Sequence, residues 1–346
     1  MSRLSSSTEL AAPPLFREIP AERPRERLLE LDAARGLAIL LVVVGHVVAR
    51  SNDMPAGNAW YAVLKEAIYL FHMPLFMALT GITFALSLPR FRNLAEAGRF
   101  SMKRVERLFV PYVVFGLLII GGKILAARYV HVDNPPGDAA LLNLVVKPTE
   151  SGVTFLWFIY VLSVYLLFIP ALFQVMGRRP MPLFLVAVAL NFAGPWPEEF
   201  MLDRVVEYLP FFAGGMLLWM ERERWTRMPL PALWALTALF LVLLALDAPK
   251  WSVGAASVLP ALGWMQRLHG PAKRWLVALG LASLAIYLMN TLAIGVAKAL
   301  MLKVMPWHGV NFLLFFPVLT LAGVFVPMLV RALAARYARP AARYLT

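Results

Sequence analysis

The sequence predicts an all-α integral membrane protein, a bundle of about ten transmembrane helices with both termini in the cytoplasm. Of the 346 residues, 60% are hydrophobic and only 15% are charged, and the mean hydropathy is +0.70. Soluble domains are about half apolar and about a quarter charged. The apolar residues form near-continuous runs of about 20 residues, which span a bilayer as helices, and not the alternating segments of a membrane β-barrel.

Ten apolar segments define the predicted bundle, which covers residues 31–330. The fifth is short and the eighth is weakly apolar, so hydropathy alone leaves nine or ten spans. Residues 1–30 are polar and predict a disordered cytoplasmic tail, and residues 331–346 predict a basic cytoplasmic tail. In chain order the segments are 31–50, 60–87, 107–127, 152–176, 181–195, 204–220, 229–246, 251–266, 275–302 and 308–330.

The basic residues predict the orientation of the helices. Most of the 33 Lys and Arg residues lie in the two tails and in alternate loops, whereas loops such as 51–59 and 194–203 have none. Basic loops stay in the cytoplasm, so the spans are even in number and ten is favoured over nine. The net charge of +13 therefore indicates membrane topology and not a nucleic-acid partner.

Three ionisable residues of the first predicted span are candidates for a functional site. Asp32 is one turn before Arg35 and can pair with it. His46 lies within about 20° of Arg35 on the same helix face, roughly 16 Å further along the axis. Arg35 alone could be an interfacial anchor, and His46 alone a helix–helix hydrogen bond. Their shared face favours a functional site, because ionisable side chains are costly inside a membrane.

The second predicted span contains His72, two residues before Pro74. This span runs back toward the cytoplasm, so His72 falls in the outer half of the membrane at nearly the depth of His46. Two imidazoles at similar depth on neighbouring helices can form one site, and imidazole suits general-base catalysis near neutral pH. The alternative is that His72 only satisfies a backbone carbonyl freed by Pro74.

The third predicted span opens with Arg104 and Arg107, which share one helix face at the cytoplasmic boundary. Two guanidinium groups there suit the phosphates of a cytoplasmic ligand. The alternative is ordinary positive charge on the inner side, in contact with lipid headgroups.

Weaker indications lie further along the chain. Trp157 opens the fourth span at the outer interface, where aromatic residues are common. Ser283, Tyr287 and Asn290 recur at helical spacing in the ninth span, where they can serve packing or catalysis. The chain has no Cys, and the two buried histidines have no carboxylate pair beside them, so we expect no metal site.

Several stretches resemble acyltransferase family 3, the bacterial inner-membrane O-acyltransferases. LDAARGLAILLVVVGH resembles the family's first span, in which ten residues separate the Arg from the His, as in Arg35 and His46. FHMPLFMALTG resembles its second span, where Ser is common at the position of Thr80, and RVERLFVPY resembles its Arg-x-x-Arg segment. The resemblance covers about 28–330 in the right order. Many members have His where this chain has Asn290, which can orient a hydroxyl but cannot take its proton.

The resemblance implies a stand-alone enzyme of the bacterial inner membrane, without a carboxy-terminal soluble domain. It implies transfer of an acyl group, acetyl in the first place, from cytoplasmic acyl-CoA to a hydroxyl of an outer-face carbohydrate or glycolipid, with no permanently bound cofactor. Arg35, Arg104 and Arg107 would hold the CoA phosphates. His46, with His72, would either deprotonate the acceptor or transiently carry the acyl group. Supporting roles are expected for Asp32, Trp157, Ser283, Tyr287 and Asn290.

A proton-coupled transporter or flippase, with the histidines as a proton relay, is the competing interpretation. It predicts an inverted repeat and carboxylates in the middle of the spans, and the sequence has neither. A non-catalytic scaffold would leave Arg35, His46 and His72 without a role.

Overall fold

The structure, a computed structural model, describes residues 28–48, 53–128, 132 and 135–345. These residues form helices joined by short connections and contain no β-strand. The short helices are α4 (Ala140–Asn143), α8 (Arg222–Thr226) and α14 (Arg339–Ala342), with 3-10 turns at Pro148–Glu150, Thr154–Leu156, Glu199–Met201 and Gly309–Asn311. The longer helices are α1 (Leu29–His46), α2 (Ala59–Ser87), α3 (Leu94–Ala126), α5 (Trp157–Val175), α6 (Pro180–Phe192), α7 (Leu202–Met220), α9 (Leu230–Ala245), α10 (Lys250–Arg267), α11 (Gly270–Leu281), α12 (Ser283–Met301) and α13 (Phe312–Tyr337).

The helices have the length and surface of a membrane protein. Large apolar side chains face outward, such as Leu118 of α3 and Leu329 of α13, which are 58% and 59% exposed. The chain is thus an all-α, multi-pass membrane protein, while the number of ten spans and the cytoplasmic placement of both termini remain predictions. By length and hydropathy, five described stretches can cross a bilayer: Ala59–Ser87, Leu94–Ala126, Thr154–Val175, Ser283–Met301 and Gly309–Tyr337.

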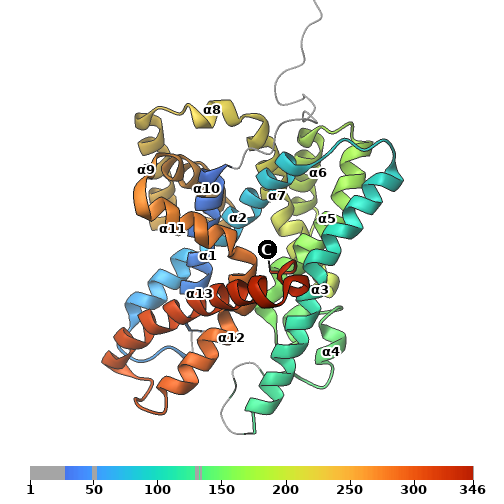
Figure 1. The fold of residues 1–346 in the computed structure, drawn as a ribbon. Coiled ribbons are helices and arrows are strands. Elements are labelled where there is room, and N and C mark those ends of the chain that lie inside the picture. The colour runs from blue at the N-terminus through green and yellow to red at the C-terminus, as the bar shows by residue number, and fades with distance from the viewer. Residues whose placement is uncertain (1–27, 49–52, 129–131, 133–134, 346) are drawn as a thin grey trace, which may run out of the picture.

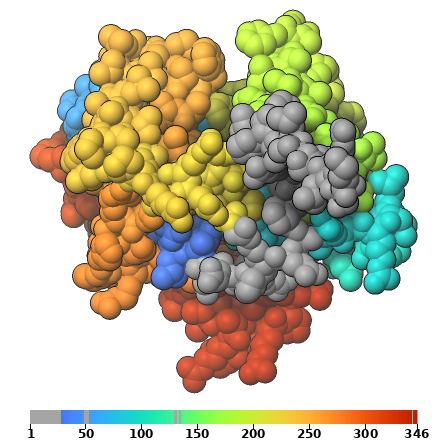
Figure 2. Space-filling view, turned by 90° about the horizontal axis from the view of Figure 1, so that it is seen from above, coloured from blue at the N-terminus to red at the C-terminus, as the bar shows by residue number. Residues whose placement is uncertain are grey.

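Helix α1 occupies the centre of the fold, where it packs against α2, α10, α11, α12 and α13. Its Ala34, Ala38 and Ile39 side chains are fully buried. In Figure 1, α9–α13 gather around α1 on one side, α3–α7 form the other side, and α2 lies beside α7 between them. Figure 2 looks onto the face that carries α8, and the start of α1 (blue) emerges there next to the yellow residues around α8. This is the face that the charge pattern predicts to be cytoplasmic.

Two pairs of glycines bring α1 and α2 very close to a neighbour. A methyl group added to Gly36 of α1 would lie 1.9 Å from a backbone carbonyl oxygen of α11, and one on Gly280 of α11 would lie 1.9 Å from a carbonyl oxygen of α1. Gly81 of α2 and Gly215 of α7 make the same reciprocal contact at 2.0 Å. Only glycine permits this approach of two backbones, which is a common way to pack membrane helices.

The third predicted segment begins earlier than expected. The side-chain oxygen of Asn93 accepts a hydrogen bond from the Glu96 N–H at 2.9 Å, which caps a helix that starts at Leu94 and not near 107. Arg104 and Arg107 therefore lie well inside α3 and not at its start.

The prediction of one continuous span at 275–302 is wrong, because this segment forms α11 and α12. The first helix ends at Ala282, whose N–H closes its last turn, and Ser283 begins the second. Helix α11 packs along α1, with Gly280 in the contact, whereas α12 packs along α13. The change of packing partner breaks a segment whose hydropathy is continuous.

The structure describes only the end of the first predicted tail but nearly all of the second. Of residues 1–30, only 28–30 are among the described residues. The other predicted tail, 331–346, is helical at its start, since α13 continues to Tyr337 through residues with high helix propensity. Beyond it, Leu345 is only 7% exposed and packs on the core, and Arg343 lies 3.9 Å from Glu106 of α3.

Candidate active site

A cavity of about 400 Å³ lies among α1, α2, α5, α7, α10 and α12. Both predicted catalytic histidines line it, His46 from the end of α1 and His72 from α2. Trp157 and Tyr287, two of the predicted supporting residues, line it as well. Within the described chain its wall consists of Val42, His46, Tyr69, His72, Met73, Thr149, Thr154, Phe155, Trp157, Arg204, Tyr208, Lys250, Tyr287 and Thr291.

Asn290 determines which nitrogen of His46 carries the proton. The Asn290 amide nitrogen donates to the carbonyl oxygens of Ile286 and Tyr287, each at 2.9 Å. Its side-chain oxygen lies 2.8 Å from His46 Nδ1 and therefore accepts the Nδ1–H hydrogen bond. Nε2 of the neutral ring then carries the lone pair, which is the form that accepts a proton from a hydroxyl group. Asn290 is 0% exposed, so water does not compete for this contact.

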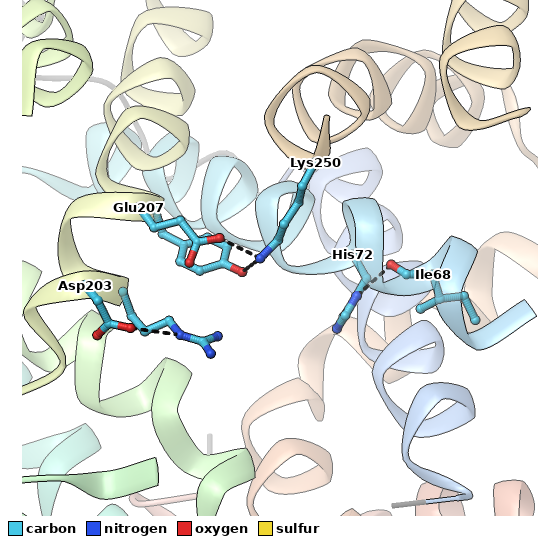
Figure 3. Close-up of polar contacts among 7 residues, drawn as sticks. Ile68, His72, Asp203, Glu207 and Lys250 are labelled. Carbon is cyan, nitrogen blue, oxygen red and sulfur yellow. Dashed lines mark hydrogen bonds and ion pairs between the residues drawn. The ribbon is translucent and has the colours of Figure 1, made fainter. Parts of the chain in front are cut away.

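His72 is held in the same tautomer by a different partner. Its Nδ1–H donates to the carbonyl oxygen of Ile68, one turn earlier in α2, at 2.7 Å (Figure 3). Pro74 lacks an N–H and therefore frees the carbonyl of Leu70, not that of Ile68. The carbonyl that His72 bonds is thus not the one that Pro74 frees. Nε2 of His72, like that of His46, remains an acceptor.

Three side chains of α2 hold the end of α1 that carries His46. Tyr61, Lys65 and Tyr69 are spaced by four residues and so share one helix face. They donate hydrogen bonds of 2.8, 2.7 and 3.4 Å to backbone carbonyls within two residues of His46. Carbonyls at the end of a helix otherwise lack partners inside the helix. The backbone on both sides of His46 is therefore fixed by α2.

Arg204 and Lys250 also line the cavity, although the sequence analysis does not single them out. Lys250 Nζ lies 2.6 Å from Glu207 Oε1 and donates a hydrogen bond to the Tyr208 hydroxyl (Figure 3). Arg204 Nε lies 3.5 Å from Asp203 Oδ2. Both cations follow loops predicted to lie outside the membrane. Basic residues are usually enriched on the cytoplasmic side, so two cations at loops predicted to be on the outer side are an exception. This exception could have identified them from the sequence.

Two aromatic residues connect the wall of the cavity. The Tyr287 hydroxyl donates to the Phe155 carbonyl and accepts the Phe158 N–H at 3.2 Å, which ties α12 to the start of α5. The Trp157 ring lies 4.8 Å from the ring of Tyr208, centre to centre. These contacts connect α12, the start of α5 and α7 in the wall of the cavity.

The remaining predicted site residues do not line the cavity. Arg35 is half-buried in α1, and its Nε is buried without a hydrogen-bond partner in the described chain. Arg104 packs on an aromatic ring of α3 at 4.5 Å, and Arg107 is exposed. Asp32 is buried, and Ser283 begins α12. The structure therefore gathers the histidines, Trp157, Tyr287 and, through His46, Asn290, but not the arginines.

No group of three or more His, Asp or Glu side chains could hold a metal ion in the part of the chain that the structure describes. The chemistry available in the cavity comes from two imidazoles, each with an acceptor nitrogen, and from the hydroxyl and cationic groups around them.

The acyltransferase domain of acyltransferase family 3 matches residues 28–332, nearly the whole chain. The chain belongs to acyltransferase family 3. This family 3 member is similar to the nodulation protein NolL of Sinorhizobium fredii, with 31% identity over 116 residues, 34% of this chain and 31% of that protein. It is also similar to NolL of Mesorhizobium japonicum, with 40% identity over 55 residues, 16% of this chain and 15% of that protein. The matches thus span about a third or less of the relatives' length, and no solved structure matches the chain.

Proposed function

We propose that this family 3 member is an O-acyltransferase of the bacterial inner membrane. It transfers an acyl group, acetyl in the first place, from cytoplasmic acyl-CoA to a hydroxyl of an outer-face glycan or glycolipid. The observation that carries the proposal is the His46–Asn290 hydrogen bond. It makes His46 Nε2 a proton acceptor at the wall of a cavity whose volume suits a small ligand.

In the proposed reaction, His46 Nε2 takes the proton of the acceptor hydroxyl while that oxygen attacks the thioester carbonyl carbon. The new C–O bond forms, the C–S bond breaks, and the proton passes from His46 to the sulfur of the departing CoA. Asn290 keeps the ring oriented throughout, because it bonds Nδ1 and leaves Nε2 to the reacting groups. His72 Nε2 accepts a hydrogen bond from a neighbouring hydroxyl of the acceptor and so positions it.

The same nitrogen supports a second route, in which His46 Nε2 attacks the thioester and carries the acyl group to the acceptor. The two routes differ in a single-turnover experiment without acceptor. An acyl-His46 intermediate releases one equivalent of CoA at once, whereas direct transfer releases CoA only when acceptor is added.

The donor is proposed to lie between the cytoplasmic edge and the cavity, with its phosphates on Arg35, Arg104 and Arg107. Support comes from Arg35, whose buried Nε lacks a hydrogen-bond partner in the described chain. A buried N–H without a hydrogen-bond partner is destabilising, and a ligand phosphate would satisfy it.

The test uses membranes that contain the full chain and measures transfer of labelled acetyl from acetyl-CoA to membrane glycan. His46→Ala is expected to lower the rate by about 10²–10⁴-fold, the usual contribution of a general base. His269→Ala, which changes an exposed histidine in a loop, is the matched control and should leave the rate unchanged. Full activity of His46→Ala at equal protein level would remove His46 from the mechanism.

A further inference from the structure

The cavity wall carries two positive charges that the proposed proton transfer does not use. Arg204 and Lys250 both line the cavity, and no Asp or Glu is among the described residues of its wall. The cationic groups of these residues therefore face the cavity, where they can attract an anionic group.

Carboxylates that do not line the cavity hold both cations in position. Lys250 Nζ is 2.6 Å from Glu207 Oε1, and Arg204 Nε is 3.5 Å from Asp203 Oδ2. Figure 3 shows Lys250 and Glu207 reaching toward each other. A charge that is already positioned loses less conformational entropy when it binds an anion than a mobile side chain does.

Aromatic rings further restrict the two cations. The Arg204 guanidinium lies 5.2 Å from the centre of the Trp157 ring, and Lys250 Nζ lies 4.7 Å from that of Tyr208. Arg204 meets Asp203 through Nε and also hydrogen-bonds the Tyr208 side chain. A guanidinium has five N–H donors, so these contacts leave donors that can bind a carboxylate or a phosphate.

The position of the cations assigns them to the acceptor. Arg204 lies in the first turn of α7, and Lys250 is the first residue of α10, so the positive ends of two helix dipoles reinforce them. Both helix starts are predicted to lie on the outer side, whereas the arginines proposed for CoA lie outside the cavity. We propose that Arg204 and Lys250 bind a carboxylate or phosphate that the acceptor carries near the acylated hydroxyl. The enzyme thus prefers an anionic sugar, an inference that rests on the proposed function.

The size of the cavity limits what enters with that group. Its volume of about 400 Å³ is near the lower end of the roughly 300–1,000 Å³ of small-molecule sites. One sugar residue with its anionic substituent fits this space, and the rest of a longer acceptor remains outside.

The experiment compares inhibitors that differ only at C6, which carries a neutral hydroxymethyl group, a carboxylate or a phosphate. Membranes with the full chain receive labelled acetyl-CoA, and transfer to the membrane glycan is measured with added methyl β-glucoside, methyl β-glucuronoside or methyl β-glucoside 6-phosphate. An anionic sugar is expected to inhibit at a roughly tenfold lower concentration than the neutral one, as one charge-assisted contact provides. Comparing the uronoside with the phosphate shows which anion the site takes.

Variants then connect this preference to the two cations. The double change Arg204→Gln with Lys250→Gln should abolish the difference between neutral and anionic sugars. Arg204→Lys with Lys250→Arg should retain it, which separates lost charge from lost folding. Lys147→Gln is the matched control, because Lys147 also pairs with glutamates, at 3.5 and 3.3 Å, but does not line the cavity.

Three outcomes would overturn the inference. Equal inhibition by all sugars, or by none, with active wild-type membranes would remove the anion site alone. A preference that survives in the double glutamine variant would place the anion elsewhere. A wild-type preference for succinyl-CoA over acetyl-CoA that depends on the two cations, with equal inhibition by the sugars, would assign them to the acyl group. By contrast, wild-type membranes that transfer no label would refute the proposed function itself.

Discussion

The two ends of α1 are built in different ways. At one end, His46 is bonded to Asn290 at 2.8 Å, and Tyr61 and Lys65 hold the carbonyls beside it. At the other end, close backbone packing surrounds Arg35, whose Nε has no hydrogen-bond partner in the described chain. His46 is therefore held in place by the chain itself, whereas Arg35 Nε has room for a partner that a ligand could supply.

This contrast separates the kinetic effects expected at the two ends. Changes around His46 should lower kcat, because they disturb a group that acts in the transition state. Changes to the arginines should raise KM for acyl-CoA with little effect on kcat, because they weaken binding of donor in the ground state and the transition state alike.

The largest expected effect comes from removing both histidines. If His72 positions the acceptor for His46, the double change His46→Ala with His72→Ala should be only slightly less active than His46→Ala, which already loses about 10²–10⁴-fold. When two residues act as one unit, the loss of rate in the double variant is smaller than the product of the two single losses. Labelled acetyl transfer by the two single variants and the double variant measures the coupling. Multiplicative losses would show that the histidines act separately.

A smaller loss is expected at Asn290. Asn290→Leu removes the acceptor for His46 Nδ1–H and should lower kcat by about 10–100-fold, the equivalent of one unsatisfied buried hydrogen bond, with KM for acetyl-CoA unchanged. Asn290→Asp keeps an acceptor for Nδ1–H, but its second oxygen then faces the carbonyl oxygens of Ile286 and Tyr287, so it should recover only part of the rate. If both variants are equally inactive, the side chain serves packing and not the orientation of His46.

A change confined to binding is expected on α3. Arg104→Gln with Arg107→Gln should raise KM for acetyl-CoA about tenfold and reduce its dependence on ionic strength, because phosphate contacts of exposed charges are screened by salt. Initial rates at several salt concentrations provide the measurement. An unchanged KM would exclude both arginines from the donor site.

No effect on activity is expected at Lys147, which lies outside the cavity. A hydrogen bond with Glu199 raises the pKa of Lys147, so its ammonium group stays charged at neutral pH. Lys147→Gln removes a solvent-exposed ion pair, and such pairs contribute little. A kcat or KM that differs from wild type in the same labelled assay would extend the functional region beyond the cavity.

Much of the fold follows from local properties of the sequence. Apolar runs of helical length predicted most of the helices, and alternating charge placed His46 and His72 at similar depth, where the structure has both at one cavity. The break at Ala282 could not be predicted in this way, because hydropathy is continuous there. It coincides with the contact of Gly280 with the backbone of Asp32 in α1, a residue far away in the sequence.

The site was harder to predict for the same reason. Asn290 is an unremarkable polar residue in its own helix, and its role depends on a histidine separated from it by 244 positions. Arg204 and Lys250 come from two further helices and meet only in the folded chain. Basic residues usually mark the cytoplasmic side, so a charge pattern alone does not indicate cations on the outer side.

The glycine contacts have a mechanical consequence. If α1 slid along α11, or α2 along α7, a larger side chain would take the place of a glycine in the contact. That side chain would clash with the neighbouring backbone, because even an added methyl group would lie only about 2 Å from a carbonyl oxygen. Each histidine-bearing helix therefore moves as one body with its partner, if it moves at all. Under the proposed function, the acyl group would reach the histidines between helices that stay packed in pairs, unlike cargo in a carrier whose halves rock around it.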